Sequence, residues 1–129
     1  MLTLPPSVKV FAATQAIDGR KGVDSLASIV RSVFREDPLS GHLFVFFSRR
    51  LDRVRVMYWD RNGFAMWSKR LEKGRYRFAT VDGALKARLI EWSDLALVLE
   101  GIELRGATRR ARWEPRSRRS AIVSTASIL

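Results

Sequence analysis

The acidic side chains are the first candidates for chemistry in this sequence, because two-metal nucleases and transposases hold their ions with converging carboxylates. Six aspartates are the candidates: Asp18, Asp24, Asp37, Asp52, Asp60 and Asp82. Each lies beside a turn signal or at a predicted helix start, where aspartate commonly closes a turn or caps a helix. We therefore interpret them as turn and capping acids and expect no metal site.

The sequence contains few of the residues that other catalytic mechanisms need. The chain has no cysteine, which excludes thiolate nucleophiles, iron–sulfur clusters and Cys-ligated zinc within it. Its single histidine, His42, leaves no pair of imidazoles for a metal and no His-based triad. No GxxxxGKS/T phosphate loop and no GxGxxG fingerprint occurs. We predict that the protein is not an enzyme and needs no cofactor; a cryptic metal-dependent nuclease is the catalytic alternative.

Basic side chains interleaved with aromatic ones form the second chemical feature, between residues 49 and 77. This stretch holds ten Arg and Lys residues against three acidic ones, together with Tyr58, Trp59, Phe64 and Trp67. Nucleic-acid-binding sheets use cations to follow phosphates and rings to stack on bases. The pattern favours DNA binding, and the alternative is a solvated basic face with the rings in the core.

The charge of the whole chain points to the same class of partner. The 129 residues carry Lys+Arg 24 against Asp+Glu 13, a formal net charge of +11, and all but five of the basic residues are arginine. Arginine suits phosphate because its planar fork donates two parallel hydrogen bonds. We predict a nucleic-acid-binding role for eight residues: Arg53, Arg55, Arg70, Arg75, Arg77, Arg109, Arg110 and Arg112.

The length of the chain predicts one domain, and the composition of its last residues predicts a basic tail. Residues 1–105 carry the patterns of regular structure, whereas residues 106–119 hold six arginines against one glutamate and suggest a flexible tail over 106–129. No signal peptide is evident, and no apolar stretch approaches the roughly 20 residues of a membrane span. We expect a cytoplasmic protein with no membrane contact and no small-molecule substrate.

The hydrophobic periodicity predicts an α+β fold. Apolar residues recur at helical spacing over 20–35, before the stop signal Asp37-Pro38, and a shorter helix is expected over 95–99 with Ser93 as its N-cap. Strands are expected over residues 7–14, 43–47, 53–59, 64–71, 75–80 and 85–89. We predict an antiparallel β-meander of about five or six strands with one main helix packed on one face, a short C-terminal helix and a basic tail.

Strand register gives the sharpest expectation. If Asn62-Gly63 is the centre of a two-residue turn, Trp59 faces Met66 and Arg55 faces Arg70. A further turn at Lys73-Gly74 would place Arg77 opposite Arg70. One face then collects a core that the helix over 20–35 would cover: Val54, Val56, Tyr58, Trp67, Leu71, Tyr76 and Phe78. The other face would carry Arg55, Arg70 and Arg77 in a row that suggests an anionic partner.

Several strings of residues resemble one known family. These are DPLSGHLFVFFSRR over 37–50, DRVRVMYWDRNGFAMWSKRLEK over 52–73 and LEGIEL over 99–104, with Arg20-Lys21-Gly22 as an opening motif. They are similar to the TnpB (Orf2) accessory proteins of bacterial insertion sequences of family sixty-six, over roughly residues 3–105. The resemblance implies an accessory protein of transposition, encoded beside a separate transposase that carries the catalytic carboxylates.

We expect, on these grounds, a non-catalytic protein that binds transposon DNA, in particular the transposon ends, or the complex of the transposase with DNA. The alternative is a pure protein–protein interaction module whose charge keeps it near DNA only through its partner. Binding of the isolated protein to DNA carrying the ends of the element distinguishes the two.

Overall fold

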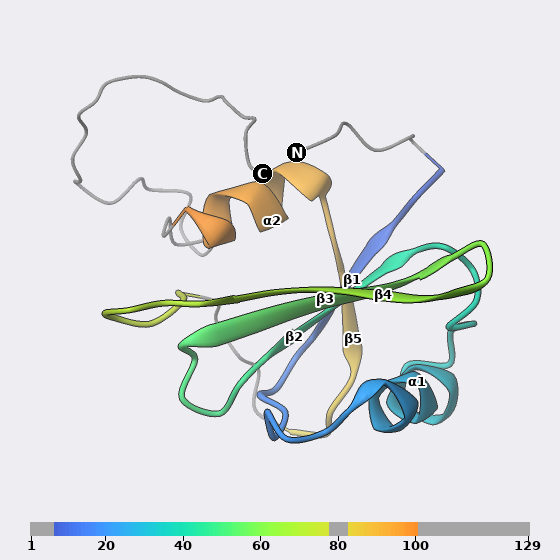
Figure 1. Ribbon diagram of the computed structural model, residues 1–129, viewed down its shortest axis with the longest axis horizontal. Coiled ribbons are helices and arrows are strands. Elements are labelled where there is room, and N and C mark those ends of the chain that lie inside the picture. Colours follow the sequence, from blue (N-terminus) through green and yellow to red (C-terminus); the bar gives the residue numbers. More distant parts are fainter. Residues whose placement is uncertain (1–6, 78–82, 101–129) are drawn as a thin grey trace.

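A computed structural model describes residues 7–77 and 83–100 of the chain. These residues form one five-stranded mixed sheet with a helix on each side (Figure 1). The elements follow in the order β1 (Val10–Ala13), α1 (Val23–Ser32), β2 (Leu43–Phe47), β3 (Arg53–Asp60), β4 (Gly63–Arg70), β5 (Ala87–Ile90) and α2 (Trp92–Leu99). The predicted α+β class is confirmed in this form.

The sheet order, β4-β3-β2-β1-β5, corrects the predicted meander. Strands β2, β3 and β4 are successive antiparallel neighbours as expected, but β1 runs parallel to β2 with α1 as the connection between them. Strand β5 returns to the far side of β1 and pairs with it antiparallel. Every residue of β1 and β2 is buried because both strands lie inside the sheet with a helix over each face.

Helix α1 occupies the middle of the segment predicted from periodicity. It begins after Gly22, carries Asp24 in its first turn and Arg31 in its last, and buries Leu26, Ala27 and Val30. These positions follow the helical repeat and place an acid and a base favourably for the helix dipole. Helix α2 has Glu91 as its N-cap rather than the predicted Ser93, because Glu91 and Asp94 form a reciprocal capping box.

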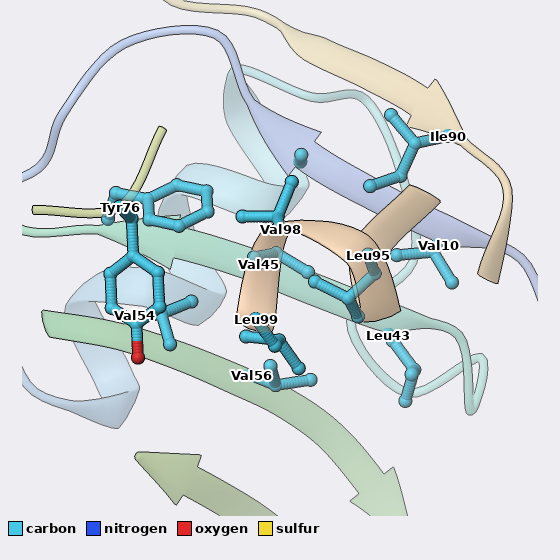
Figure 2. Packing of buried hydrophobic residues seen from close by; sticks show 12 residues of the cluster. Val10, Leu43, Val45, Val54, Val56, Tyr76, Ile90, Leu95, Val98 and Leu99 are labelled. Carbon is cyan, nitrogen blue, oxygen red and sulfur yellow. The ribbon is translucent and has the colours of Figure 1, made fainter. Parts of the chain in front are cut away.

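Each face of the sheet has its own core. On one face, the side chains of α1 pack on Phe11, Phe44, Phe46 and Met57. On the opposite face, α2 packs Leu95, Val98 and Leu99 against strand residues (Figure 2), a cluster that comprises Val10, Ala12, Leu43, Val45, Phe47, Val54, Val56, Tyr76 and Ile90.

The face expected to be the core is therefore buried by a different helix from the one predicted. Val54, Val56, Tyr58, Trp67, Leu71 and Tyr76 do lie in or against one cluster, but α2 covers it and α1 lies across the sheet (Figure 1). The structure places the shorter, C-terminal helix there because both faces of β1 and β2 are apolar and each requires a cover.

The turn of the β3–β4 hairpin lies one residue earlier than predicted, which shifts the pairing of the two strands by two residues. Its turn is Arg61-Asn62, since Asp60 pairs with Gly63 and Trp59 pairs with Phe64. Arg61 takes the positive φ of 61° in place of Gly63. A shift of two residues preserves which side chains share a face, so the division of β3 and β4 into two faces is confirmed, while Arg53 rather than Arg55 lies opposite Arg70.

The strand expected over 75–80 does not begin where predicted. Residues 75–77 are not part of a strand, and residues 78–82, which include Phe78 and Asp82, lie outside the described residues. The chain after β4 instead folds back over the β2–β3 turn, where the amide of Tyr76 donates to the carbonyl of Leu51 at 2.6 Å. Arg77 is therefore not a cross-strand neighbour of Arg70, and the predicted row Arg55–Arg70–Arg77 is wrong.

Tyr76 gives the fold a specific alkaline sensitivity. Burial raises the pKa of its phenol from 10.0 to about 12, because the phenolate would lie in apolar surroundings. Its contribution to stability is complete below pH 10, and it is lost as the pH rises towards 12, because the unfolded chain ionises first. We expect Tyr76→Phe to lose less unfolding free energy than the wild type across this interval in urea titrations. An equal loss in both proteins would contradict the assignment.

Candidate functional site

Arginine side chains from three separate segments surround one open hollow of about 370 Å³. The segments are the loop before α1, the β2–β3 turn with the start of β3, and the end of β4. We call this site the arginine-rich hollow; its lining comprises Asp18, Gly19, Arg20, Ser48, Arg49, Arg50, Asp52, Arg53 and Arg70.

The β2–β3 turn presents two of these arginines. The amide of Leu51 donates to the carbonyl of Ser48 at 2.8 Å, which makes Arg49 and Arg50 the two central residues of a tight turn. Leu51 follows with a φ of 60°, in the left-handed region. The Ser48 hydroxyl donates to Asp52 Oδ1 at 3.0 Å and accepts from the amide of Arg53 at 3.1 Å. The turn is thus fixed from within, and its arginine side chains are left to project.

The chain beyond β4 holds the same turn from behind. The amide of Leu71 donates to the carbonyl of Asp52 at 2.7 Å, and Tyr76 makes its bond to Leu51. Tyr76 is almost fully buried, with its ring 5.7 Å from that of Phe47. A buried aromatic residue therefore anchors the backbone that carries Arg49 and Arg50.

The loop before α1 forms the facing wall. Asp18 accepts from the amide of Arg20 at 2.9 Å and pairs with its guanidinium at 3.0 Å. The guanidinium and amide of Arg20 hold the pKa of the Asp18 carboxyl well below its usual range, and Asp18 raises the pKa of Arg20. Asp18 is therefore a turn acid, as predicted, and its charge is already matched.

Arg53 and Arg55 fasten that loop to the sheet. Arg53 Nη2 donates to the carbonyl of Gly19 at 2.6 Å. Arg55 donates to the carbonyls of Lys21 and Asp18, the latter at 3.3 Å. Only 9% of Arg55 is exposed, and burial lowers the pKa of its guanidinium, with the charge of Arg53 acting in the same direction. Arg55 is thus a structural tie between β3 and the loop.

Arg70 completes the hollow from the last position of β4. It lies directly opposite Arg53 in the antiparallel pair, where Cβ atoms are about 4.5–5.5 Å apart. Within the described part of the chain, neither Arg70 nor the turn residues Arg49 and Arg50 form an ion pair with a carboxylate. Three cations therefore line the hollow without forming an ion pair.

The predicted site residues separate into distinct groups. Arg53 and Arg70 line the hollow, Arg55 is buried behind it, and Arg75 and Arg77 are exposed but outside its lining. The tail residues Arg109, Arg110 and Arg112 lie outside the described residues. Of the arginines in the lining, the prediction omitted three: Arg20, Arg49 and Arg50. Two adjacent arginines between a buried strand and the next strand were the signal available for the last two.

The aromatic residues of the same hairpin do not form one platform. Trp59 and Phe64 meet edge to face at 5.1 Å near the hairpin turn, at the other end of β3 from Arg53. Tyr58 and Trp67 lie on the opposite face and pack against the α2 cluster. The interpretation of the rings as core is therefore correct for Tyr58 and Trp67.

The described residues contain neither a metal-binding cluster nor a membrane-spanning helix. Across 7–77 and 83–100, no three His, Asp or Glu side chains gather in a way that would hold a metal ion. In the same ranges, no helix is both long and apolar enough to cross a bilayer.

Comparison with known proteins gives a consistent family. The family model described as IS66 Orf2 like protein matches residues 8–109. The chain is also similar to two uncharacterized proteins of Sinorhizobium fredii (strain NBRC 101917 / NGR234). It is 39% identical to y4jC over 94 residues, 72% of this chain and 80% of that protein. It is 35% identical to y4hO over 115 residues, 89% of this chain and 96% of that protein. No solved structure matches the sequence.

Proposed function

Because this chain belongs to the family of IS66 Orf2-like proteins, we propose that it is a non-catalytic accessory protein of insertion-sequence transposition that binds DNA directly. Its partners would be the DNA of the element, including its ends, and the separate transposase that performs the chemistry. The bound surface would be the arginine-rich hollow, with the basic segment beyond residue 105 adding charge.

The observation that carries the proposal is the excess of arginine over aspartate around the hollow. Five arginines line it against two aspartates, and both carboxylates already accept hydrogen bonds, Asp18 from Arg20 and Asp52 from Ser48. Clustered guanidinium groups repel one another unless an anion lies between them. DNA supplies such anions in phosphates, which dominate the affinity of most proteins for DNA.

The engagement of the acids supports a role without catalysis. A two-metal active site needs carboxylates whose oxygens are free to converge on an ion. Here Asp18 is paired with Arg20, and Asp37 accepts from the amide of Leu39 at 2.9 Å within its own turn. These contacts use the carboxylates to build loops, and strand transfer would belong to the transposase.

The salt dependence of duplex binding tests the proposal. We expect the Arg49→Ala/Arg50→Ala variant to bind duplex DNA more weakly and to lower the slope of log K against log salt by up to about 1.8, or about 0.9 per lost phosphate contact. Arg31→Ala is the matched control because Arg31 is exposed on α1 and outside the hollow. Fluorescence anisotropy over a salt series measures both effects.

Three results would contradict this function. If Arg31→Ala changes the slope of log K against log salt by as much per removed charge as the double variant does, DNA binding depends only on net charge. The hollow is then not the interface. If the purified wild type binds no DNA and associates only with the transposase, the protein is an interaction module. Cleavage of labelled DNA with Mg²⁺ by the purified protein would refute the non-catalytic assignment.

A further inference from the structure

We propose that the arginine-rich hollow binds the terminal phosphate of a DNA strand, a phosphate monoester, in preference to phosphodiesters within the strand. The inference rests on the proposed function, because it names the part of DNA that the hollow recognises. The protein would then recognise the ends of DNA strands and also bind backbone phosphates.

The shape of the site favours an end. The hollow measures about 370 Å³ and is open to solvent, so a strand end can reach its lining directly. A phosphodiester inside a strand is flanked by chain on both sides, which holds it against a surface rather than within a hollow. A terminal phosphate is attached on one side only, so it enters a concave site with its remaining oxygens directed at the lining.

The charges of the site favour a dianion. Arg53 and Arg70 lie directly opposite one another on paired strands, an arrangement that is unfavourable for like charges in a sheet. Arg49 and Arg50 approach from the neighbouring turn. A phosphate monoester carries close to two negative charges at neutral pH and three acceptor oxygens, whereas a diester carries one charge. More guanidinium groups can therefore be satisfied around the monoester.

One of these guanidinium groups is held in place before any ligand binds. Arg53 Nη2 donates to the carbonyl of Gly19, so one of its edges is fixed and other donors of the fork remain for an anion. A Cβ atom on Gly19 would lie 2.7 Å from Arg53 Nη2. The observed position of the Arg53 guanidinium therefore requires a glycine at residue 19. Gly19 is thus a positioning residue for Arg53.

The negative charges of the two lining aspartates do not prevent an anion from binding. Both Asp18 oxygens accept from the guanidinium of Arg20, and Asp52 Oδ1 accepts from the hydroxyl of Ser48. The Asp18–Arg20 pair is close to neutral, and Asp52 keeps its charge, so the five arginines and two aspartates leave the lining with a net positive charge of about three.

The test compares one single-stranded oligonucleotide with a 5′-phosphate and with a 5′-hydroxyl end, and the same two ends in duplex form. We expect the wild type to bind the phosphorylated forms about tenfold more tightly, the effect of one added set of charge-assisted hydrogen bonds. Competition by a free mononucleotide distinguishes a strand end from a soluble phosphate monoester, and anisotropy reports each affinity.

Two variants connect the preference to the hollow. Arg70→Ala is expected to abolish it, and so is Gly19→Ala, which displaces the Arg53 guanidinium. Both should melt close to the wild type, because Arg70 is exposed and the atom displaced by the new methyl group is the end of a flexible side chain. Gly22→Ala is the matched control: a Cβ there meets nothing within 4 Å, so the preference should persist.

Each outcome decides a separate point. Equal affinity of the wild type for both ends overturns the inference and leaves DNA binding intact. An absence of binding to any DNA overturns the proposed function and this inference together. A preference that survives both Arg70→Ala and Gly19→Ala places the end elsewhere on the protein. Equal competition by the free mononucleotide assigns the hollow to a soluble nucleotide and overturns the assignment to a strand end.

Discussion

Replacing Arg55 with alanine is expected to lower the free energy of unfolding by about 2–4 kcal/mol, through lost charge-assisted hydrogen bonds and lost packing. The Arg55 guanidinium donates to the carbonyls of Asp18 and Lys21, and only 9% of the residue is exposed. Its removal leaves both carbonyls without this partner, and Arg53 remains as the arginine that ties the loop before α1 to β3. Urea titration followed by tryptophan fluorescence measures the loss.

Arg70→Ala is the control for this prediction, because Arg70 shares the strand pair but is exposed and faces a like charge. We expect its stability to equal or slightly exceed that of the wild type. We also expect Arg55→Ala to weaken DNA binding, since the loop that carries Arg20 loses one of its ties to the sheet. Wild-type stability in Arg55→Ala would show that the buried guanidinium is dispensable and that this account of the loop is wrong.

Leu95→Ala is expected to cost about 2–5 kcal/mol, the range for a large-to-small change in a core. Helix α2 has eight residues, and isolated helices shorter than about 12–15 residues are marginal in water. Its helical state therefore depends on packing, and Leu95, which is 1% exposed, lies over Val10 and Leu43 in the centre of that contact (Figure 2). Thermal unfolding followed by circular dichroism measures the effect.

Leu97→Ala provides the comparison on the same helix. Leu97 is half-buried rather than buried, and the exchange of leucine for alanine changes helix propensity equally at both positions. We expect a much smaller loss of stability from Leu97→Ala. Similar losses at the two positions would mean that α2 is stabilised by its own propensity and not by the sheet.

Local patterns predicted what local forces determine. The helical repeat in α1, the apolar run of β2 and the alternation in β3 and β4 arise from burial of one side or both, and each element lies where its pattern placed it. The hairpin register was wrong by two residues because Asn62-Gly63 is a strong turn signal, yet Arg61 adopts the positive φ instead. The side chains of β3 and β4 were still assigned to the correct faces of the sheet, because side chains alternate between faces with a period of two residues.

The remaining features depend on contacts between distant parts of the chain. The pairing of β1 with β5 joins Val10 to Ile90, and no local pattern encodes it. The buried state of Arg55 is set by carbonyls in the loop before α1, so its charge alone suggested a binding residue. The hollow likewise assembles residues 18–20, 48–53 and 70, of which the sequence indicated only the basic composition.

The position of β1 governs the order in which the chain completes its fold during synthesis. Of the described strands, β1 is synthesised before the other four, but one of its two hydrogen-bonded edges waits for β5, whose last residue is Ile90. Until then the nascent protein presents an apolar strand with an open edge, which is a template for pairing with other chains. Translation of β5 closes that edge, so premature release of the polypeptide before Ala87 yields an aggregation-prone product.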